Sequence, residues 1–564
     1  MSVFETAKSR SDGLTRRQMV GLVGAAGAGL AVSPGLGGVE PAAAAPAAAV
    51  PAPPQDRRLQ ALKEEAIRAV NKRSKLVQEI VDSIFSFSEL GFQEFQTKRY
   101  LLSILRKNGF SVQEGISGIP TAWMATWGSG GPVIALGSDI DGIPRSSQKP
   151  GVIGRNPLVE PIGFDHAPGH GEGHNSGMAA VIASAIVLKE LMQRHNIKGT
   201  LKLWPGVAEE LVGTKAFYVR DGYFDDVDVT LFAHVSSGLS VDWGAASGNG
   251  LLSLEYTFRG SPGHGASPHL GRSALDAVQL MTAGMEYRRE HLPIQQRTHF
   301  VISEGGDQPN VIPEIAKVWY YLREDTADEI IALRALAEKI ARGAAQMTDT
   351  ELVNIQVLGA ASPQHFNRPV AEAAAANMTL VGMPAWSEDD HTYARAVQKA
   401  AGSSNPRGLA TEVAGLSGPI PNQYRQGGGS DDIGDITWKT PTITIRYPAN
   451  IPSGGPSHTW WNALAMATPI AHKGTTTCAA VYATTVLELL LRPQLVQDAW
   501  EYFETEQAGR YKPLIGPDDK PAVHLNRERM ELWRPRLEKL YYNPSRYKTY
   551  LDQLGISYPS GTSR

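Results

Sequence analysis

The sequence contains very little cysteine, because Cys478 is the single thiol among 564 residues. One cysteine excludes an intrachain disulfide, a cysteine-based zinc cluster and an iron–sulfur site. A bound metal would therefore be held mainly by histidine, aspartate and glutamate, and the chain has 14 histidines to supply. Cys478 itself falls within an apolar helical pattern, where a buried structural thiol is expected.

An excess of positive charge is missing as well. The 54 basic and 57 acidic side chains give a formal net charge of −3, so we expect no nucleic-acid partner. Hydrophobic residues make up 42% of the chain and charged residues 20%, which excludes wholesale disorder. The Gly-x-Ser-x-Gly turn of many serine hydrolases is also absent. At roughly 100–200 residues per domain, the length implies more than one packed unit.

Residues 1–49 are interpreted as an export signal. Basic residues between Lys8 and Arg17 precede an apolar stretch from Met19 to Val32, and an Ala/Pro-rich run follows. The stretch is shorter than the ~20 residues of a spanning helix, so we expect cleavage and no stable membrane span afterwards. The Arg16-Arg17 pair favours the twin-arginine export machinery, whose cargo generally crosses the membrane folded. This predicts a periplasmic or secreted protein; a Sec signal with two chance arginines is the alternative.

Strand and helix patterns alternate along residues 50–246, which predicts the first part of an α/β catalytic domain with a mostly parallel central sheet. The expected strands are Thr121–Trp127, Pro132–Gly137, Thr200–Trp204 and Val227–His234, and the expected helices are Asp56–Asp82, Ser176–Gln193 and Leu211–Asp221.

A different pattern occupies residues 247–362. Its β-α-β-β-α-β order predicts an inserted ferredoxin-like α+β domain. Residues 363–490 return to the first domain, with a strand at Thr440–Tyr447 and an apolar helix at Asn462–Leu490. Residues 491–564 form an aromatic-rich extension, which is expected to pack against the body because disordered tails are poor in aromatics.

Three groups of polar residues suggest a metal site. Glu172 and His174 bracket one residue among glycines, a spacing that lets both face one ion on an extended segment. Glu209 and Glu210 follow a predicted strand, where one carboxylate can bind metal while the other handles protons. His234 ends another strand, where ligands gather in open α/β sheets. A polar turn and a solvated acidic helix start are the alternatives for the first two groups.

The chain resembles the co-catalytic metallopeptidase family that includes aminoacylases, glutamate carboxypeptidases and aromatic amidohydrolases. The resemblance extends over roughly residues 88–490 and comprises many ordered matches, so chance similarity is excluded. The matching runs are 89–94 (ELGFQE), 138–144 (SDIDGIP), 169–175 (GHGEGHN), Glu209-Glu210, His234, 271–276 (GRSALD), 309–313 (PNVIP) and 456–460 (PSHTW).

The resemblance implies a two-metal site with a separate proton-transfer group. Glu209 matches the general base and acid, and Asp139 and Asp141 match the Asp-x-Asp-x-x-Pro run, where they would orient imidazoles. Asp141 is the stronger match for that role. The five metal ligands implied are Glu172, His174, Glu210, His234 and His458.

The insert is implied to be a dimerisation (lid) domain. His264 matches a histidine that reaches across a homodimer to polarise the substrate carbonyl in the partner's active site. Asn310 and Arg323 match residues that contact the amide or carboxylate end of the substrate, and an arginine fork suits a free carboxylate.

One position departs from the family pattern. Glu172 stands where this amidohydrolase branch usually has cysteine. A carboxylate can bridge two ions, so two divalent cations, zinc or manganese, are still expected in this oxygen and nitrogen setting.

The expected activity is hydrolysis of the amide bond in N-acyl amino acids, which would include aromatic acyl groups, or in related small amides, by a metal-activated water. Two alternatives remain: a dipeptidase or carboxypeptidase acting on short peptides, and a metal-dependent binding protein without catalysis. Glu209 beside Glu210 argues against the second, because a binding protein has no need of the additional carboxylate.

Overall fold

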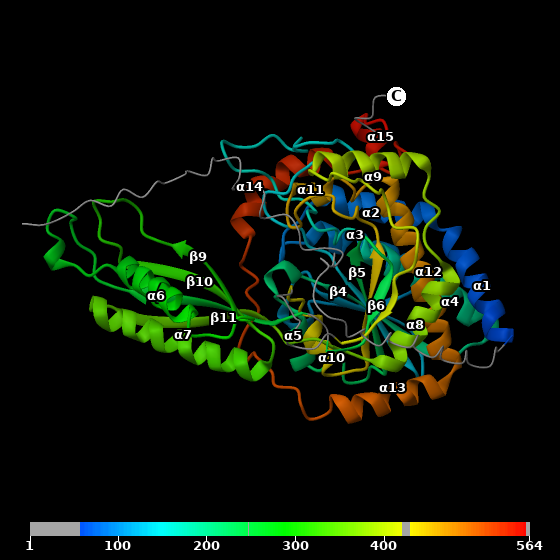
Figure 1. Ribbon diagram of the computed structural model, residues 1–564, viewed down its shortest axis with the longest axis horizontal. Helices are drawn as coiled ribbons and strands as arrows, with labels where there is room; N and C mark the ends of the chain where they lie inside the picture. Colours follow the sequence, from blue (N-terminus) through cyan, green and yellow to red (C-terminus); the bar gives the residue numbers. More distant parts are fainter. Residues whose placement is uncertain (1–56, 246–247, 420–428, 560–564) are drawn as a thin grey trace, which may run out of the picture. The chain divides into compact units, whose positions relative to one another are not determined.

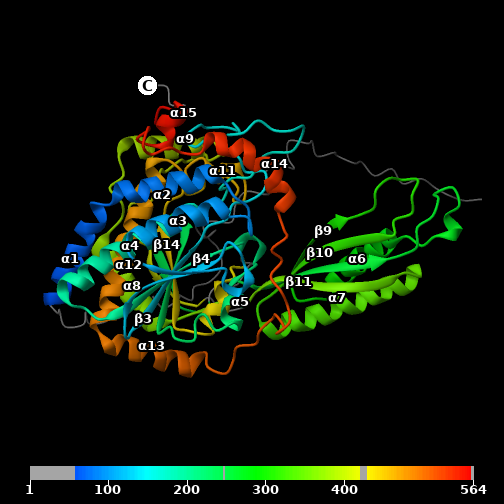
Figure 2. The same cartoon turned by 180° about the vertical axis from the view of Figure 1, so that it is seen from behind.

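The computed structural model describes residues 57–245, 248–419 and 429–559. The predicted export signal lies outside these described residues. The fold is mixed α/β with a mostly parallel large sheet, as predicted, and a second, smaller sheet lies in the inserted domain (Figures 1 and 2).

The large sheet has the strand order β1-β2-β4-β3-β5-β14-β6-β13. Its four inner strands β4, β3, β5 and β14 are mutually parallel, and apolar residues on both faces of β3 and β5 explain their central place. The strands are β1 Ser111–Glu114, β2 Trp123–Ser129, β3 Val133–Asp139, β4 Gly199–Gly206, β5 Val229–Ser236, β6 Ser240–Asp242, β13 Gly415–Ser417 and β14 Thr442–Pro448.

Helices α4 (Gly177–His195) and α12 (Pro469–Leu491) pack against each other and against this sheet. Among the described residues, α12 is the one helix that is long and apolar enough to cross a membrane by length and composition, but 83% of its apolar window is buried inside the protein. The same domain contains α1 Arg57–Asn71, α2 Ser74–Phe87, α3 Phe95–Lys107, α5 Lys215–Arg220, α8 Arg368–Val381, α9 Glu388–Ala400, α10 Ile433–Thr437 and α11 Trp460–Ala463, with a small sheet of β7 (Gly244–Ala245) and β12 (His365–Phe366).

Three predicted helices have different limits in the structure. The predicted helix Asp56–Asp82 is divided into α1 and α2 around Arg73. The helix predicted at Leu211 begins at Lys215, because Val212 adopts a left-handed conformation with φ +48°. The helix predicted from Asn462 begins at Pro469, where proline occupies the first helical turn.

The inserted domain (residues 250–361) has the predicted β-α-β-β-α-β order. Its antiparallel sheet runs β11-β8-β10-β9, and α6 and α7 lie side by side along one face of it (Figures 1 and 2). Alternate residues of β10 are buried, which is the pattern of a strand with one face covered. The elements are β8 Gly250–Arg259, α6 Ala274–Arg289, β9 Arg297–Glu304, β10 Ile315–Glu324, α7 Ala327–Thr348 and β11 Glu351–Ala361.

The C-terminal extension contains α13 (Pro493–Glu506), α14 (Arg527–Leu537) and α15 (Tyr550–Leu554). It packs along the body: Trp533 is fully buried beside Leu90, and the Tyr550 backbone N–H donates to Asp82 Oδ2 at 2.8 Å. Between α13 and α14, Lys512 pairs with Asp328 of α7 at 2.6 Å. The extension therefore contacts both the catalytic domain and the insert.

Candidate metal centre

The predicted metal ligands come from segments at the C-terminal ends of the parallel strands. His234 lies on β5, Glu210 lies in a 3₁₀ turn (Glu209–Leu211) after β4, and Glu172 and His174 precede α4. The C-terminal ends of parallel strands meet at one edge of a sheet, which is where ligands bind in open α/β folds. His458 joins them from the loop between β14 and α11.

Glu172 lies at the centre of this group. Its Oε2 is 2.8 Å from His174 Nε2, and its Oε1 is 3.6 Å from His234 Nε2 and 3.8 Å from His458 Nε2. His458 Nδ1 lies 3.3 Å from Glu210 Oε2. The structure therefore brings together all five residues that the resemblance implies.

The donor atoms fit divalent cations. Glu172, His174, Glu209 and Glu210 each place one ligand atom within 4.8 Å of the others. His174 Nε2 and Glu210 Oε1 are buried without a hydrogen-bond partner of suitable geometry among the described residues. Since buried polar atoms are nearly always satisfied, such atoms call for an explanation, and a cation provides one. The oxygen and nitrogen donor set suits zinc or manganese.

The two aspartates of the Asp-x-Asp run have different partners. Asp141 Oδ1 lies 3.2 Å from His174 Nδ1, and Asp141 Oδ2 accepts the Glu210 backbone N–H at 3.1 Å. This geometry fixes the imidazole so that Nε2 faces Glu172, as expected of a carboxylate that orients a ligand. Asp139 Oδ2 lies 4.0 Å from His174 Nε2, whereas its Oδ1 accepts from Lys215 Nζ at 2.7 Å.

Lys215 is a fully buried cation beside the centre. Its Nζ also pairs with Asp432 and, at 3.4 Å, with Asp431. Burial opposes the lysine charge, but these carboxylates and Asp139 hold the pKa of Lys215 well above its usual range. Lys215 thereby ties the segment after Gly429 to the start of α5 and the end of β3.

The Glu209–Glu210 turn is strained and externally supported. Ala208 before it has φ +53° and Val212 after it has φ +48°, a left-handed region that disfavours residues with a Cβ. Glu94 Oε1 accepts the Ala208 backbone N–H at 2.9 Å, and Tyr321 donates its hydroxyl to the Glu210 carbonyl at 3.2 Å.

The surroundings of the site raise the pKa of some of its titratable groups and lower the pKa of others. Burial raises the pKa of Glu209 well above its usual range, and the Asp431 and Asp139 carboxylates raise it further. Burial would also raise the pKa of Glu172, but the surrounding imidazoles, His174 foremost, hold it well below its usual range. The hydrogen bond to Glu172 raises the pKa of His458 to about 9.

A cavity of about 350 Å³ opens over these residues. Arg323 of β10 reaches it from the insert, with Nη1 at 3.4 Å from Ser430 Oγ and a buried Nε without a partner among the described residues. Arg446 of β14 lies on its wall, with Nη1 at 3.5 Å from His234 Nδ1 and Nε at 3.9 Å from Asp242. Val212 and Leu251 supply apolar surface.

His264 and Asn310 lie elsewhere in this chain. Both are exposed on paired loops of the insert, where the Gly265 N–H donates to the Asn310 carbonyl at 2.9 Å. Neither is among the described residues that line the cavity.

Sequence reasoning missed three contributors: Lys215, Arg446 and Glu94. Arg446 had a usable signal, since it ends a predicted strand next to the one that carries His234, and the two residues are partners in register. Lys215 had no such signal. Glu94 lies in the matching run 89–94, but its contact with Ala208 could not be inferred, because it joins distant segments.

Comparisons with known proteins agree with this geometry. A family model described as a peptidase dimerisation domain of the M20 type matches residues 247–347. A p-aminobenzoyl-glutamate hydrolase component from Escherichia coli (strain K12) is 32% identical over 479 residues, which cover 81% of this chain and 97% of that protein. The chain belongs to the M20 family. It is accordingly a metal-dependent hydrolase of amide bonds.

Two further matches are more distant. The Xaa-Arg dipeptidase of Mus musculus is 24% identical, with 79% of this chain and 93% of that protein covered. A solved structure from methicillin-resistant Staphylococcus aureus, described as an aminohydrolase, superposes with a TM-score of 0.53 at 18% identity and covers 76% of this chain and 100% of that chain. The structural likeness supports the fold.

Proposed function

We propose that the protein hydrolyses N-acyl amino acids at a two-metal site held by Glu172, His174, Glu210, His234 and His458, with Glu209 as general base and acid. The observation that carries this proposal is the convergence of the side chains on Glu172, with Glu209 Oε2 at 3.9 Å from His174 Nε2. Two divalent ions at such a site would activate water and polarise the scissile carbonyl.

The surroundings of Glu209 support its proposed role in the proton transfers. Burial, with the Asp431 and Asp139 carboxylates, raises the pKa of Glu209 well above the usual range, which suits a group that must hold a proton and return it to the departing amine. Glu209 would take a proton from the attacking water and deliver it to the departing amine. Asp141 would hold His174 in the orientation that leaves Nε2 free.

We further propose that the leaving amino acid is acidic. Arg323 and Arg446 place guanidinium groups on the insert side and the sheet side of the same cavity, and arginine forks recognise carboxylates. Arg323 would take the α-carboxylate, as the family resemblance implies, and Arg446 a side-chain carboxylate. The bacterial relative named as a p-aminobenzoyl-glutamate hydrolase supports an aromatic acyl group and glutamate.

A matched substrate set tests this proposal. The wild type should hydrolyse 4-aminobenzoyl-glutamate with a higher kcat/KM than 4-aminobenzoyl-glutamine, which has the same shape without the second charge. Arg446→Gln should lower kcat/KM for the glutamate substrate by roughly 10–100-fold, the loss expected for one charge-assisted contact, and leave the glutamine substrate nearly unchanged. Equal losses for both substrates would refute the role of Arg446.

Other results would contradict the proposed activity as a whole, whatever the role of Arg446. Two bound metals per protomer with no hydrolysis of acyl amino acids or dipeptides would indicate a binding protein. Preference for dipeptides over acyl amino acids would indicate a peptidase. The metal-free protein is loaded with zinc or with manganese, and its metal content is measured. The ion that restores the higher activity is the preferred one.

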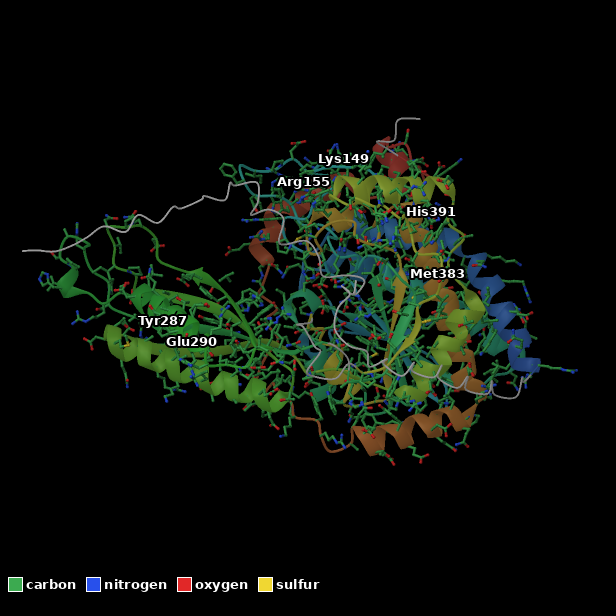
Figure 3. The ribbon with its side chains drawn as sticks, viewed as in Figure 1. Lys149, Arg155, Tyr287, Glu290, Met383 and His391 are labelled. Atoms are coloured by element: carbon green, nitrogen blue, oxygen red, sulfur yellow. The ribbon has the colours of Figure 1, made fainter. Side chains whose placement is uncertain are left out.

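A homodimer formed through the insert is part of the proposal. Strand β9 is an edge strand, and Phe300, Val301 and Ile302 on it are 39%, 56% and 45% exposed. Tyr287, near the end of α6, is 81% exposed on the same domain (Figure 3). Apolar edge strands pair with other strands. In such a dimer, His264 and Asn310 would serve the partner's active site, which would explain their distance from their own cavity.

Export by the twin-arginine route completes the proposal. Its support is the sequence of residues 1–49 alone, with the arginine pair before a short apolar stretch. Replacement of Arg16 and Arg17 by lysine should leave the protein in the cytoplasm, whereas export of that variant would indicate the Sec route.

A further inference from the structure

The C-terminal extension is connected to the Glu209–Glu210 turn (the catalytic turn) through one short segment of the catalytic domain, residues 89–94. We propose that α14 of the extension, acting through Glu89–Glu94, positions the Glu209–Glu210 turn for metal binding and proton transfer. This inference rests on the proposed roles of Glu209 and Glu210, and it assigns the extension a part in the reaction without any contact with substrate.

The Glu209–Glu210 turn depends on surrounding contacts for its conformation. Ala208 and Val212, at its two ends, both have left-handed φ values. This conformation is unfavourable for a residue that carries a Cβ, and such strain persists only where surrounding contacts hold it. Small relaxations at either end would move both carboxylates, since only Glu209–Leu211 separates the two residues.

The turn contacts residues 89–94 through a hydrogen bond and through packing. Glu94 Oε1 accepts the Ala208 N–H at 2.9 Å. Gly91 packs directly on Ala208, because a Cβ at Gly91 would lie 2.8 Å from Ala208 Cα and 2.9 Å from its Cβ. A displacement of the segment would therefore act on Ala208 both by hydrogen bonding and by packing.

The C-terminal extension contacts the same segment, residues 89–94. Arg534 Nη2 donates to the Gln93 carbonyl at 2.7 Å and to Glu89 Oε1 at 3.2 Å. Glu89 is buried, and its carboxylate also accepts the Thr97 N–H at the start of α3 at 2.9 Å. Three further contacts join the two segments: Asn526 Nδ2 to the Gly91 carbonyl at 3.2 Å, Gln93 Nε2 to the Leu525 carbonyl at 3.0 Å, and the packing of Leu90 in a cluster with Met530, Trp533 and Leu537.

These contacts form a continuous path from α14 to the catalytic turn. Loss of the Arg534 cation would leave the buried Glu89 carboxylate without its charged partner, which is costly in a dry environment. The segment would then rearrange, and Ala208 would lose the acceptor that supports its strained conformation. Partners that orient metal ligands typically affect metal affinity or activity by 10–100-fold.

Full-length variants of Arg534 test the path. Arg534→Gln should lower kcat about tenfold and weaken zinc binding about tenfold, with KM within about twofold. Arg534→Lys should recover part of both losses because it restores the charge. The matched control is Arg536→Gln on the same helix, whose side chain lies over Trp533 at 5.5 Å and is exposed; it should leave kcat and zinc affinity unchanged.

A second pair of variants tests the other end of the path. Glu94→Ala removes the acceptor for Ala208 and should lower kcat and zinc affinity, whereas Glu94→Gln keeps a carbonyl oxygen and should recover most of both. All variants are assayed well below their unfolding temperatures, so that a merely structural role would lower the unfolding temperature and leave kcat and zinc affinity at wild-type values. That result would overturn the inference.

The proposed function and the positioning role would be refuted by different results. A wild type that binds zinc but hydrolyses no amide would refute the proposed function, and the zinc affinities of the variants would still test the positioning. A wild type that binds no zinc or manganese would overturn both.

Discussion

Glu172 Oε2 lies 2.8 Å from His174 Nε2, while Oε1 of the same carboxylate faces His234 Nε2 at 3.6 Å. One carboxylate thus faces ligands from two different segments of the chain. A thiolate offers one donor atom at this position, whereas a carboxylate offers two, which suits a ligand shared between two ions. The cysteine that the resemblance leads one to expect here can therefore be replaced by Glu172 without loss of a donor at the site.

The first prediction concerns this exchange. Glu172→Cys should make the enzyme sensitive to hydrogen peroxide, because a thiolate near metal is oxidised readily and a carboxylate is not. The measurement is residual activity after graded peroxide treatment and metal reloading. Equal resistance of the two proteins would contradict the idea that glutamate protects the site from oxidation. Cys478 is buried and provides the internal control, since it is present in both.

Glu209→Gln should keep both metals and lose activity by about 10²–10⁴-fold, because general acid–base catalysis typically contributes that much. Metal content is measured beside kcat. Near-wild-type turnover would refute the assigned role, and loss of metal would show that Glu209 acts as a ligand.

Metal binding should release protons and strengthen with pH. Burial opposes the His174 charge, but Glu172 and Asp141 raise its pKa well above 6.5, and the pKa of His458 is raised to about 9. Imidazole binds metal only when neutral, so zinc affinity should rise between pH 6.5 and about 9. Calorimetry in buffers of different ionisation enthalpy would detect the released protons; a pH-independent affinity would contradict this prediction.

The same groups predict the stability of the metal-free protein. A raised histidine pKa stabilises the folded state below the unfolded pKa of about 6.5, and this contribution is lost as pH rises through the folded pKa. The unfolding temperature of the metal-free protein should therefore fall between pH 6.5 and about 9. The metal-loaded protein should not show the same fall.

Lys215→Met should destabilise the protein by about 3–5 kcal/mol, since it leaves Asp139 and Asp432 buried without their cation. Urea unfolding measures the loss. Lys202→Met is the matched control, because its partner Asp226 is largely exposed, and it should cost less than about 1 kcal/mol.

Val301→Glu on β9 should weaken the homodimer by placing a charge on an exposed edge strand. Size-exclusion chromatography with light scattering would report the change of mass. Lys339→Glu on α7 is a control that leaves this edge unaltered. A wild-type monomer would contradict the proposed dimer.

Much of the fold was predictable from the sequence because its elements have strong local patterns. Strands β3 and β5 are largely apolar, and the order of elements in the insert follows from its own sequence patterns. The predicted helix limits were wrong where the backbone conformation departed from the pattern. At Val212 the φ angle is left-handed, which the sequence does not predict for valine. Pro469 was a usable signal for the start of α12 that the apolar pattern obscured.

The site was predictable to the extent that motifs carry it. Glu172 and His174 share one run, and His234 ends a recognisable strand. Lys215 was not predictable, because its partners lie 76 and 217 residues away and their proximity depends on the tertiary fold. Glu94 lies in the recognisable run 89–94, but its contact with Ala208 was unpredictable for the same reason, since it joins residues 114 positions apart.

The burial of Trp533 against Leu90 and the Tyr550 contact to Asp82 also set an order of events during synthesis. Helix α2 and the segment after it leave the ribosome early, but Tyr550 is translated 468 residues after Asp82. The body can therefore be completed only when nearly the whole chain has emerged. A translocation pathway that accepts finished folds would suit such a chain, whereas a prematurely terminated product would expose the Leu90 surface and be open to proteolysis.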